Sequence, residues 1–183
     1  MNKKDKIIAG LLAAAVVLFC AVQFWVLPAR QEKQEAYARA QTDALTHDIT
    51  AIEEYRSPYI GNASNTGGLF EHLPLSDVSK SYAIDADNCA LTVHYLDTVG
   101  HIGEQKVRRA LIYNSAAAMA AIDNLTAITY QFSGDTYSFD RDQLERSFGA
   151  PLSDLLERES WEEKVQNRLN DAAFVAQFFR EEN

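Results

Sequence analysis

The residues of this chain that could carry out chemistry are four histidines, a few serines and several carboxylates. The closest grouping is His94, Asp97 and His101, at a predicted strand end and in the loop after it. Zinc sites use three or four such ligands, backed by further hydrogen-bonded groups. Three residues around a loop fall short of that pattern. We therefore expect a surface histidine beside a polar turn, with no metal ion and no cofactor.

Motifs for catalysis or nucleotide binding are absent from the sequence. Ser76, Ser79 and Lys80 occur together in "SDVSK", but their spacing is not Ser-x-x-Lys. No Gly-x-Ser-x-Gly occurs, and no lysine follows the paired glycines as in a phosphate-binding loop. The carboxylates near position 160 are typical of a solvated helix face. We expect a protein that is not an enzyme and has no catalytic residues.

The stretch "EEYRSPYIGNASNTGGLFEHLPL" at residues 53–75 is the most individual part of the chain. Pro58 ends the preceding helix, and Gly61 permits a tight turn. "LFEHL" is one short helical turn before the next proline. We predict that the stretch is the structural entrance to a domain, with Tyr59 and Ile60 buried against a sheet. Tyr59→Ala would then lower the melting temperature by several degrees.

The same stretch contains the candidate binding residues. Tyr59, Asn62, Asn65 and Thr66 could present an aromatic ring, amides and a hydroxyl to a polar ligand. Turn chemistry alone also accounts for the asparagines and the threonine. The sequence leaves both interpretations open.

An apolar segment at residues 7–27 follows the basic start "MNKKDK". It is long enough to cross a bilayer as a helix, and the lysines place residues 1–6 in the cytoplasm. Phe19 before Cys20 argues against a lipoprotein, and a cleavable signal peptide would be shorter. We predict an uncleaved, single-pass signal anchor in the cell membrane, with the rest of the chain outside the cytoplasm.

The charge of the chain excludes nucleic acid as a partner. The whole chain carries a net charge of −9. Leaving out residues 1–27 removes three of the 17 Lys and Arg and one of the 26 Asp and Glu, so residues 28–183 carry −11. Such a domain repels polyanions.

The two cysteines, Cys20 and Cys89, lie in different parts of the chain, so we expect no disulfide within it. We expect Cys89 to be a small, buried residue of a strand.

Residues 28–55 read as a helical stalk, with one helix over about residues 31–55. Alanine, leucine and isoleucine recur there at helical spacing, and no glycine or proline interrupts the pattern after Pro28. A stalk that continues the membrane helix is one interpretation. A coiled coil that makes a homodimer is the other.

Residues 56–183 are predicted to form an extracytoplasmic α+β domain. "SYAID" with "ALTVHYLDT" and "TAITYQF" with "TYSFD" each read as a hairpin, and a helix at about residues 103–124 separates them. "RDQLERSFG" is a short helix, and a capping box at Ser160 and Glu163 opens a long C-terminal helix. We predict a small antiparallel sheet of two hairpins covered by helices.

Three motifs resemble a known family. "SPYIGNASNTGGLFEHLPL", "LTVHYL" and "AAMAAIDNLTAITYQF" are similar to domain of unknown function 4825, a small domain of membrane-anchored proteins from Gram-positive bacteria. The matching positions are Pro58, Tyr59, Ile60, Gly61, Asn62, Leu73, Pro74, Ile122, Asp123 and Asn124. The resemblance covers residues 55–155. Some relatives carry antirepressor metallopeptidases of the kind that sense β-lactams, but this chain has no His-Glu-x-x-His.

The resemblance implies a sensory or interaction role and assigns no role to single residues. We expect a membrane-anchored binding or sensory module, with a membrane or cell-envelope protein as its partner. The alternative is a structural envelope protein that associates with itself.

Overall fold

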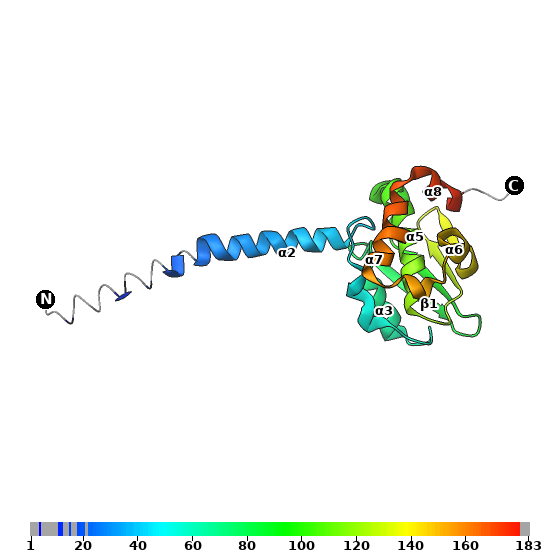
Figure 1. Ribbon diagram of the computed structural model, residues 1–183, viewed down its shortest axis with the longest axis horizontal. Helices are drawn as coiled ribbons and strands as arrows, with labels where there is room; N and C mark the ends of the chain where they lie inside the picture. The colour runs from blue at the N-terminus through cyan, green and yellow to red at the C-terminus, as the bar shows by residue number, and fades with distance from the viewer. Residues whose placement is uncertain (1–3, 5–10, 13–14, 16–17, 21, 180–183) are drawn as a thin grey trace. The chain divides into compact units, whose positions relative to one another are not determined.

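The folded domain is built around a four-stranded β-sheet (Figure 1). Its strands are β1 (Lys80–Asp85), β2 (Ala90–Tyr95), β3 (Ala127–Gln131) and β4 (Thr136–Asp140), in this order across the sheet. The outer pairs β1–β2 and β3–β4 are antiparallel hairpins, which confirms the two predicted hairpins. β2 and β3 run parallel. The predicted all-antiparallel sheet is therefore wrong at its centre, and the sheet is mixed.

Helix α5 (Glu104–Ala121) explains the parallel pair. Parallel neighbours need a crossover connection, usually a helix, because a tight turn cannot return the chain to the same end of the sheet. α5 provides this crossover between β2 and β3. The helix itself and its α+β context agree with the sequence analysis. The wrong part of the prediction was the direction of β3 relative to β2.

The other elements of the domain are helical. They are η2 (Ile49–Tyr55), α3 (Ala63–Glu71), α4 (Val99–Ile102), α6 (Arg141–Phe148), η3 (Leu152–Leu155), α7 (Arg158–Trp161), η4 (Glu162–Gln166), η5 (Asn167–Asn170), α8 (Ala172–Ala176) and η6 (Gln177–Phe179). η4 is a π-helical turn, and the other η elements of the domain are 3₁₀-helices. Several of them surround α5, which contacts η2, α3, α6, η3 and α8.

The core lies between one face of the sheet and α5. Leu91 pairs with Ile128 and Ile128 with Phe139, and each of the three side chains is at most 1% exposed. Ser115 of α5 donates a hydrogen bond to the hydroxyl of Tyr130 on β3 (3.1 Å), which places the helix against this face. α5 is buried on all sides from residue 110 onward. Its run of small alanine side chains permits close packing on several sides.

The structure, a computed structural model, describes residues 4, 11–12, 15, 18–20 and 22–179. The chain divides into two units, Met1–Arg39 and Ala40–Asn183. The first contains the π-helical η1 (Val22–Val26) and most of α2 (Leu27–Gln41). No helix among the described residues has both the length and the apolar character needed to cross a membrane. The membrane segment predicted at residues 7–27 lies partly outside the described residues.

Helix α2 ends at Gln41, so the continuous helix predicted over residues 31–55 is wrong beyond that point. Thr46 Oγ1 donates to the carbonyl oxygen of residue 40 (2.7 Å), and the Asp48 carboxylate accepts from the backbone N–H of residue 50 (3.1 Å). Such local side-chain bonds compete with the helical pattern. The chain continues as the 3₁₀-helix η2, and Ile52 is buried in the domain.

The polar stretch that follows Gly61 is helical, although only "LFEHL" was predicted to be so. Asn62 is the N-cap of α3, because its Oδ1 accepts the backbone N–H of Asn65 (3.1 Å). The helix therefore begins about six residues earlier than predicted. Gly68 lies on the side of α3 that meets the Tyr55 ring, where a Cβ atom would collide with that ring. The glycine permits this close contact.

The C-terminal segment consists of short helical pieces where one long helix was predicted. α7 begins at Arg158, so Ser160 lies inside it and no capping box forms there. The carboxylate of Asp171 then accepts the backbone N–H two residues on (2.8 Å) and caps α8. Trp161 and Leu169 are buried, as predicted. The apolar pattern was sound, but a side-chain cap within it restarts the helix.

Candidate functional site

The four candidate binding residues lie at or just before the start of α3. The ring of Tyr59 is 69% exposed. The Asn62 side chain caps the helix, and Asn65 Nδ2 donates to the carbonyl oxygen of residue 55 (2.7 Å). The buried Thr66 hydroxyl lies 3.1 Å from the carbonyl oxygen of Asn62, to which it donates. These bonds give the three polar residues a structural role at the helix start.

Ile60 anchors the entrance to the domain, so the prediction of a buried Tyr59 is wrong. Ile60 is fully buried, and its backbone N–H donates to Oδ1 of Asn124 (2.8 Å). Ser57 forms a single parallel bridge with Ile122 at the end of α5. The chain turns at Ile60 and Gly61, and this turn leaves the Ile60 side chain in the core and the Tyr59 ring at the surface.

Two substitutions test this assignment. We expect Ile60→Ala to lower the free energy of unfolding by about 2–4 kcal/mol, because a buried aliphatic side chain leaves a cavity. Tyr59→Ala should cost less than about 0.5 kcal/mol. Thermal melts of the detergent-solubilised full chain measure both. A Tyr59→Ala protein that melts as early as Ile60→Ala would contradict the assignment.

Cys89 is half-buried in the turn between β1 and β2. The prediction of a buried strand residue is therefore wrong. Its φ of 51° lies in the left-handed region, which tight turns use. Asn124 Nδ2 donates to its sulfur (3.4 Å). Asn124 therefore connects the hairpin turn with the backbone of Ile60, which gives this residue of the "IDN" motif a structural function.

The structure brings Asp97 and His101 together. His101 Nδ1 lies 2.7 Å from Asp97 Oδ2, and this hydrogen bond lowers the pKa of the Asp97 carboxyl. His94 makes no side-chain hydrogen bond with either of them in the described part of the chain. Among the described residues, no group of three or more His, Cys, Asp or Glu side chains could hold a metal ion. The largely exposed His101 and its partner form a surface contact.

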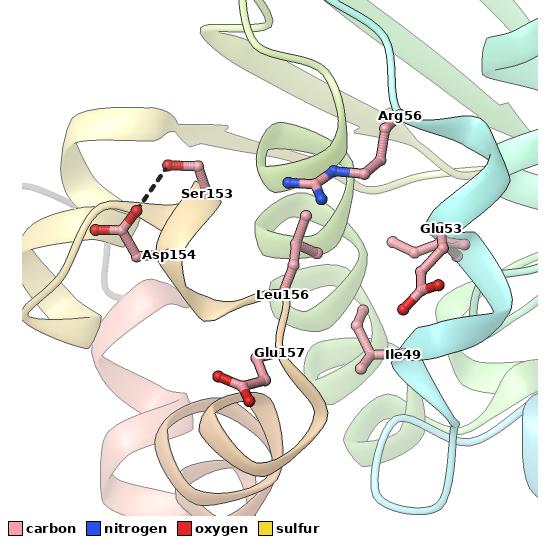
Figure 2. A pocket seen from close by; sticks show the side chains of 8 residues that line it. Ile49, Glu53, Arg56, Ser153, Asp154, Leu156 and Glu157 are labelled. Atoms are coloured by element: carbon pink, nitrogen blue, oxygen red, sulfur yellow. Dashed lines mark hydrogen bonds between the residues drawn. The ribbon is translucent and has the colours of Figure 1, made fainter.

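A hollow of about 260 Å³ opens between η2 and the segment that contains η3 (Figure 2). Ile49 and Ile52 of η2 are buried beside it, and Leu156 is half-buried. These three side chains give the hollow an apolar lining. Its polar residues come from both sides, with Glu53 and Arg56 on one and Ser153, Asp154 and Glu157 on the other.

The charged groups of this hollow are not paired with one another. Asp154 accepts a hydrogen bond from Ser153 Oγ (3.3 Å). The side chains of Glu53, Arg56 and Glu157 make no hydrogen bond or ion pair with any described residue. A lining of apolar side chains with unpaired charges of both signs is suited to binding a small polar ligand. The sequence analysis missed the hollow because its two sides are about 100 residues apart.

A buried polar cluster lies behind the same segment, and it too was missed. His47 is 2% exposed, and its Nδ1 accepts from the Tyr113 hydroxyl (2.7 Å) while Nε2–H donates to the His72 carbonyl oxygen (2.5 Å). Burial lowers the pKa of the His47 imidazole. The sequence analysis placed His47 in the helical stalk and gave no indication that this histidine is buried.

The stability of the domain is expected to fall as the pH drops below about 6.5, the ordinary pKa of histidine. Unfolded chains take up a proton on His47 near that pH, whereas burial keeps the folded imidazole neutral to a lower pH. The unfolded state then binds more protons, so the free energy of unfolding decreases as the pH falls. The hydrogen bond to the His72 carbonyl oxygen and the Asp48 carboxylate oppose this lowering of the pKa, and the His72 imidazole adds to it.

Melting curves between about pH 7.5 and 5 test this window. The decrease in melting temperature should be smaller for His47→Gln than for the wild type. Equal decreases in both proteins would assign the pH dependence to other groups.

Comparison with known proteins identifies the family. Residues 52–142 match the family model described as Domain of unknown function (DUF4825). No curated protein and no solved structure matches the chain. The matched region includes the entrance at Ile60, the whole sheet and α5, and it ends at the start of α6. The chain therefore contains a DUF4825 domain at residues 52–142, as its motifs indicated.

Proposed function

We propose that this protein is a non-enzymatic binding or sensory module, anchored in the cell membrane of a Gram-positive bacterium with its folded domain outside the cytoplasm. The apolar segment at residues 7–27 and the lysines before it support the anchor. The described apolar side chains Leu18, Phe19 and Phe24 are 64–74% exposed, as lipid-facing residues of an anchor would be.

The observation that supports binding most directly is the hollow in Figure 2. Arg56 offers an unpaired guanidinium, while Glu53 and Glu157 offer unpaired carboxylates around an apolar lining. A ligand with an ammonium group and a carbonyl or carboxylate oxygen would satisfy both signs of charge. Free amino acids and peptides have this chemistry.

Two measurements test the proposal. Protease added to intact, wall-stripped cells should digest the folded domain and leave the N-terminal segment in the membrane. A domain that is protected until the membrane is opened would refute the orientation.

For binding, the full chain in uncharged detergent is heated with a panel of amino acids, amines and dipeptides. We expect ligand-dependent stabilisation that Arg56→Ala and Glu53→Gln abolish. Asp142→Asn, which removes an exposed charge outside the hollow, should leave the response unchanged.

Self-association is a second candidate function, favoured by the open face of the sheet. Two rows of paired residues on this face carry no lysine, arginine or carboxylate: Ala83, Thr92, Thr129 and Ser138, and Ser81, His94, Gln131 and Thr136. Two copies of an acidic chain could meet along these two rows without direct opposition of charge, whereas the third row of the face carries Asp85 and Asp140. Light scattering after gel filtration distinguishes the two functions, since a stable oligomer without any ligand response would favour the structural one.

A further inference from the structure

A second hollow lies on the surface that contains the first. Both are formed where residues 45–56 meet residues 153–167, a junction that we call the seam. The second hollow also has about 260 Å³, and its lining includes Asp48, Arg158 and Glu162. The seam therefore provides two binding spaces of similar size.

The two hollows are neighbours. Ile49 and Glu157 line the first, and the residues next to them in the chain, Asp48 and Arg158, line the second. Asp48 and Arg158 form an ion pair across the seam, with Nη2 and Oδ2 2.5 Å apart. This ion pair separates the two spaces, so a ligand that occupied both would pass over it.

Carboxylates dominate the seam. Its charged lining consists of Asp48, Glu53, Asp154, Glu157, Glu162, Arg56 and Arg158, five acidic and two basic residues with a net charge of −3. Arg158 is shared between Asp48 and Glu162, at 2.5 and 3.5 Å. The carboxylates of the first hollow have no cation in contact with them among the described residues. The seam therefore attracts cations.

The two sides of the seam are fixed to each other from below. Gln166, which is 7% exposed, donates from Nε2 to the carbonyl oxygens of Ala44 (3.0 Å) and His47 (2.8 Å). These buried bonds join the C-terminal helical pieces to the start of the domain. The binding spaces are thus present before a ligand arrives, which reduces the entropic cost of binding.

We infer that the seam binds an extended, cationic peptide segment of a partner protein. One lysine or arginine side chain would enter each hollow, and Arg56 would donate to a peptide carbonyl oxygen. The inference rests on the proposed binding function and specifies its ligand. Two linked cations suit the seam better than one, because the second binds at a high effective concentration once the first is in place.

The full chain in uncharged detergent is titrated with a fluorescent peptide of about ten residues that alternates alanine and lysine. We expect saturable binding, weaker at about 300 mM salt than at about 50 mM. Glu53→Gln and Glu157→Gln should each weaken binding about two- to fivefold. The corresponding alanine–glutamate peptide and lysine amide should bind much less well.

The matched control is the double variant Asp135→Asn, Asp142→Asn, which removes two exposed carboxylates outside the seam. It should bind the cationic peptide as the wild type does. Equal loss in the control and in the seam variants would show general attraction to an acidic protein and overturn the inference.

Other outcomes separate this inference from the proposed function. If free amino acids stabilise the protein through Arg56 while the cationic peptide does not bind, the inference fails and the binding function stands. If the acidic peptide binds more tightly than the basic one, the inference also fails. Protection of the domain from external protease would refute the proposed function, whatever the peptide does.

Discussion

Replacing Trp161 with alanine is expected to lower the free energy of unfolding by about 3–5 kcal/mol, the largest effect of any single substitution considered. Trp161 is fully buried, and its ring packs edge-on against Tyr113 of α5, with ring centres 5.1 Å apart. Tyr113 in turn bonds His47. Loss of the indole would leave a cavity where the C-terminal pieces, α5 and the start of the domain meet.

The matched control is Trp161→Phe. It keeps an aromatic ring, and it removes an indole N–H that has no hydrogen-bond partner among the described residues. Its cost should therefore be clearly smaller, about 1–2 kcal/mol. Thermal and urea unfolding of the detergent-solubilised chain measure both variants. Equal destabilisation by Phe and Ala would show that the indole N–H contributes, with the neighbouring Tyr113 hydroxyl as its partner.

Arg141→Ala is expected to cost about 3 kcal/mol, because a largely buried guanidinium holds the end of α5. Its Nη2 donates to the carbonyl oxygens of residues 119, 122 and 123 (2.6, 2.9 and 3.1 Å), and its Nε donates to that of Leu125 (3.0 Å). The cation also interacts favourably with the negative end of the helix dipole. Without it, several carbonyl oxygens would lose their donors at once.

Arg141→Lys should recover part of the loss, since one ammonium group keeps the charge but cannot reproduce the guanidinium fork. Arg146→Ala, a change at an exposed position of the same helix, should cost less than about 0.5 kcal/mol. The melting temperatures of the three variants give the order. If Arg141→Ala melts within about one degree of the wild type, the carbonyl bonds contribute little to stability.

Several parts of the fold could be predicted because their cause is local. Alternation of Leu91, Val93 and Tyr95 with polar residues predicts β2, and apolar residues at helical spacing, such as Val107, Ala110 and Leu111, predict α5. Gly149 ends α6 in the left-handed conformation, with φ 75°. Each of these features depends on neighbours a few residues away. The family motifs were also evident in the sequence, and the family match confirms them.

The candidate site could not be predicted in the same way. Its two sides, residues 45–56 and 153–167, are brought together by burial of Trp161 and by the bonds of Gln166 to distant carbonyl oxygens. The loop that the sequence favoured around Asn62 and Asn65 is instead the capped start of a helix. A segment rich in polar side chains has the same amino-acid composition whether those side chains bind a ligand or cap their own backbone.

The sequence by itself determined the two hairpins, the helix between them, the acidic character and the family of this chain. Only the tertiary structure decided that β2 and β3 are parallel, that Ile60 and not Tyr59 enters the core, and that His47 is buried. The physical reason is the range of the interactions. Periodicity and turn chemistry act between near neighbours, whereas strand direction and the choice of a buried side chain depend on surfaces that meet only after the chain has folded.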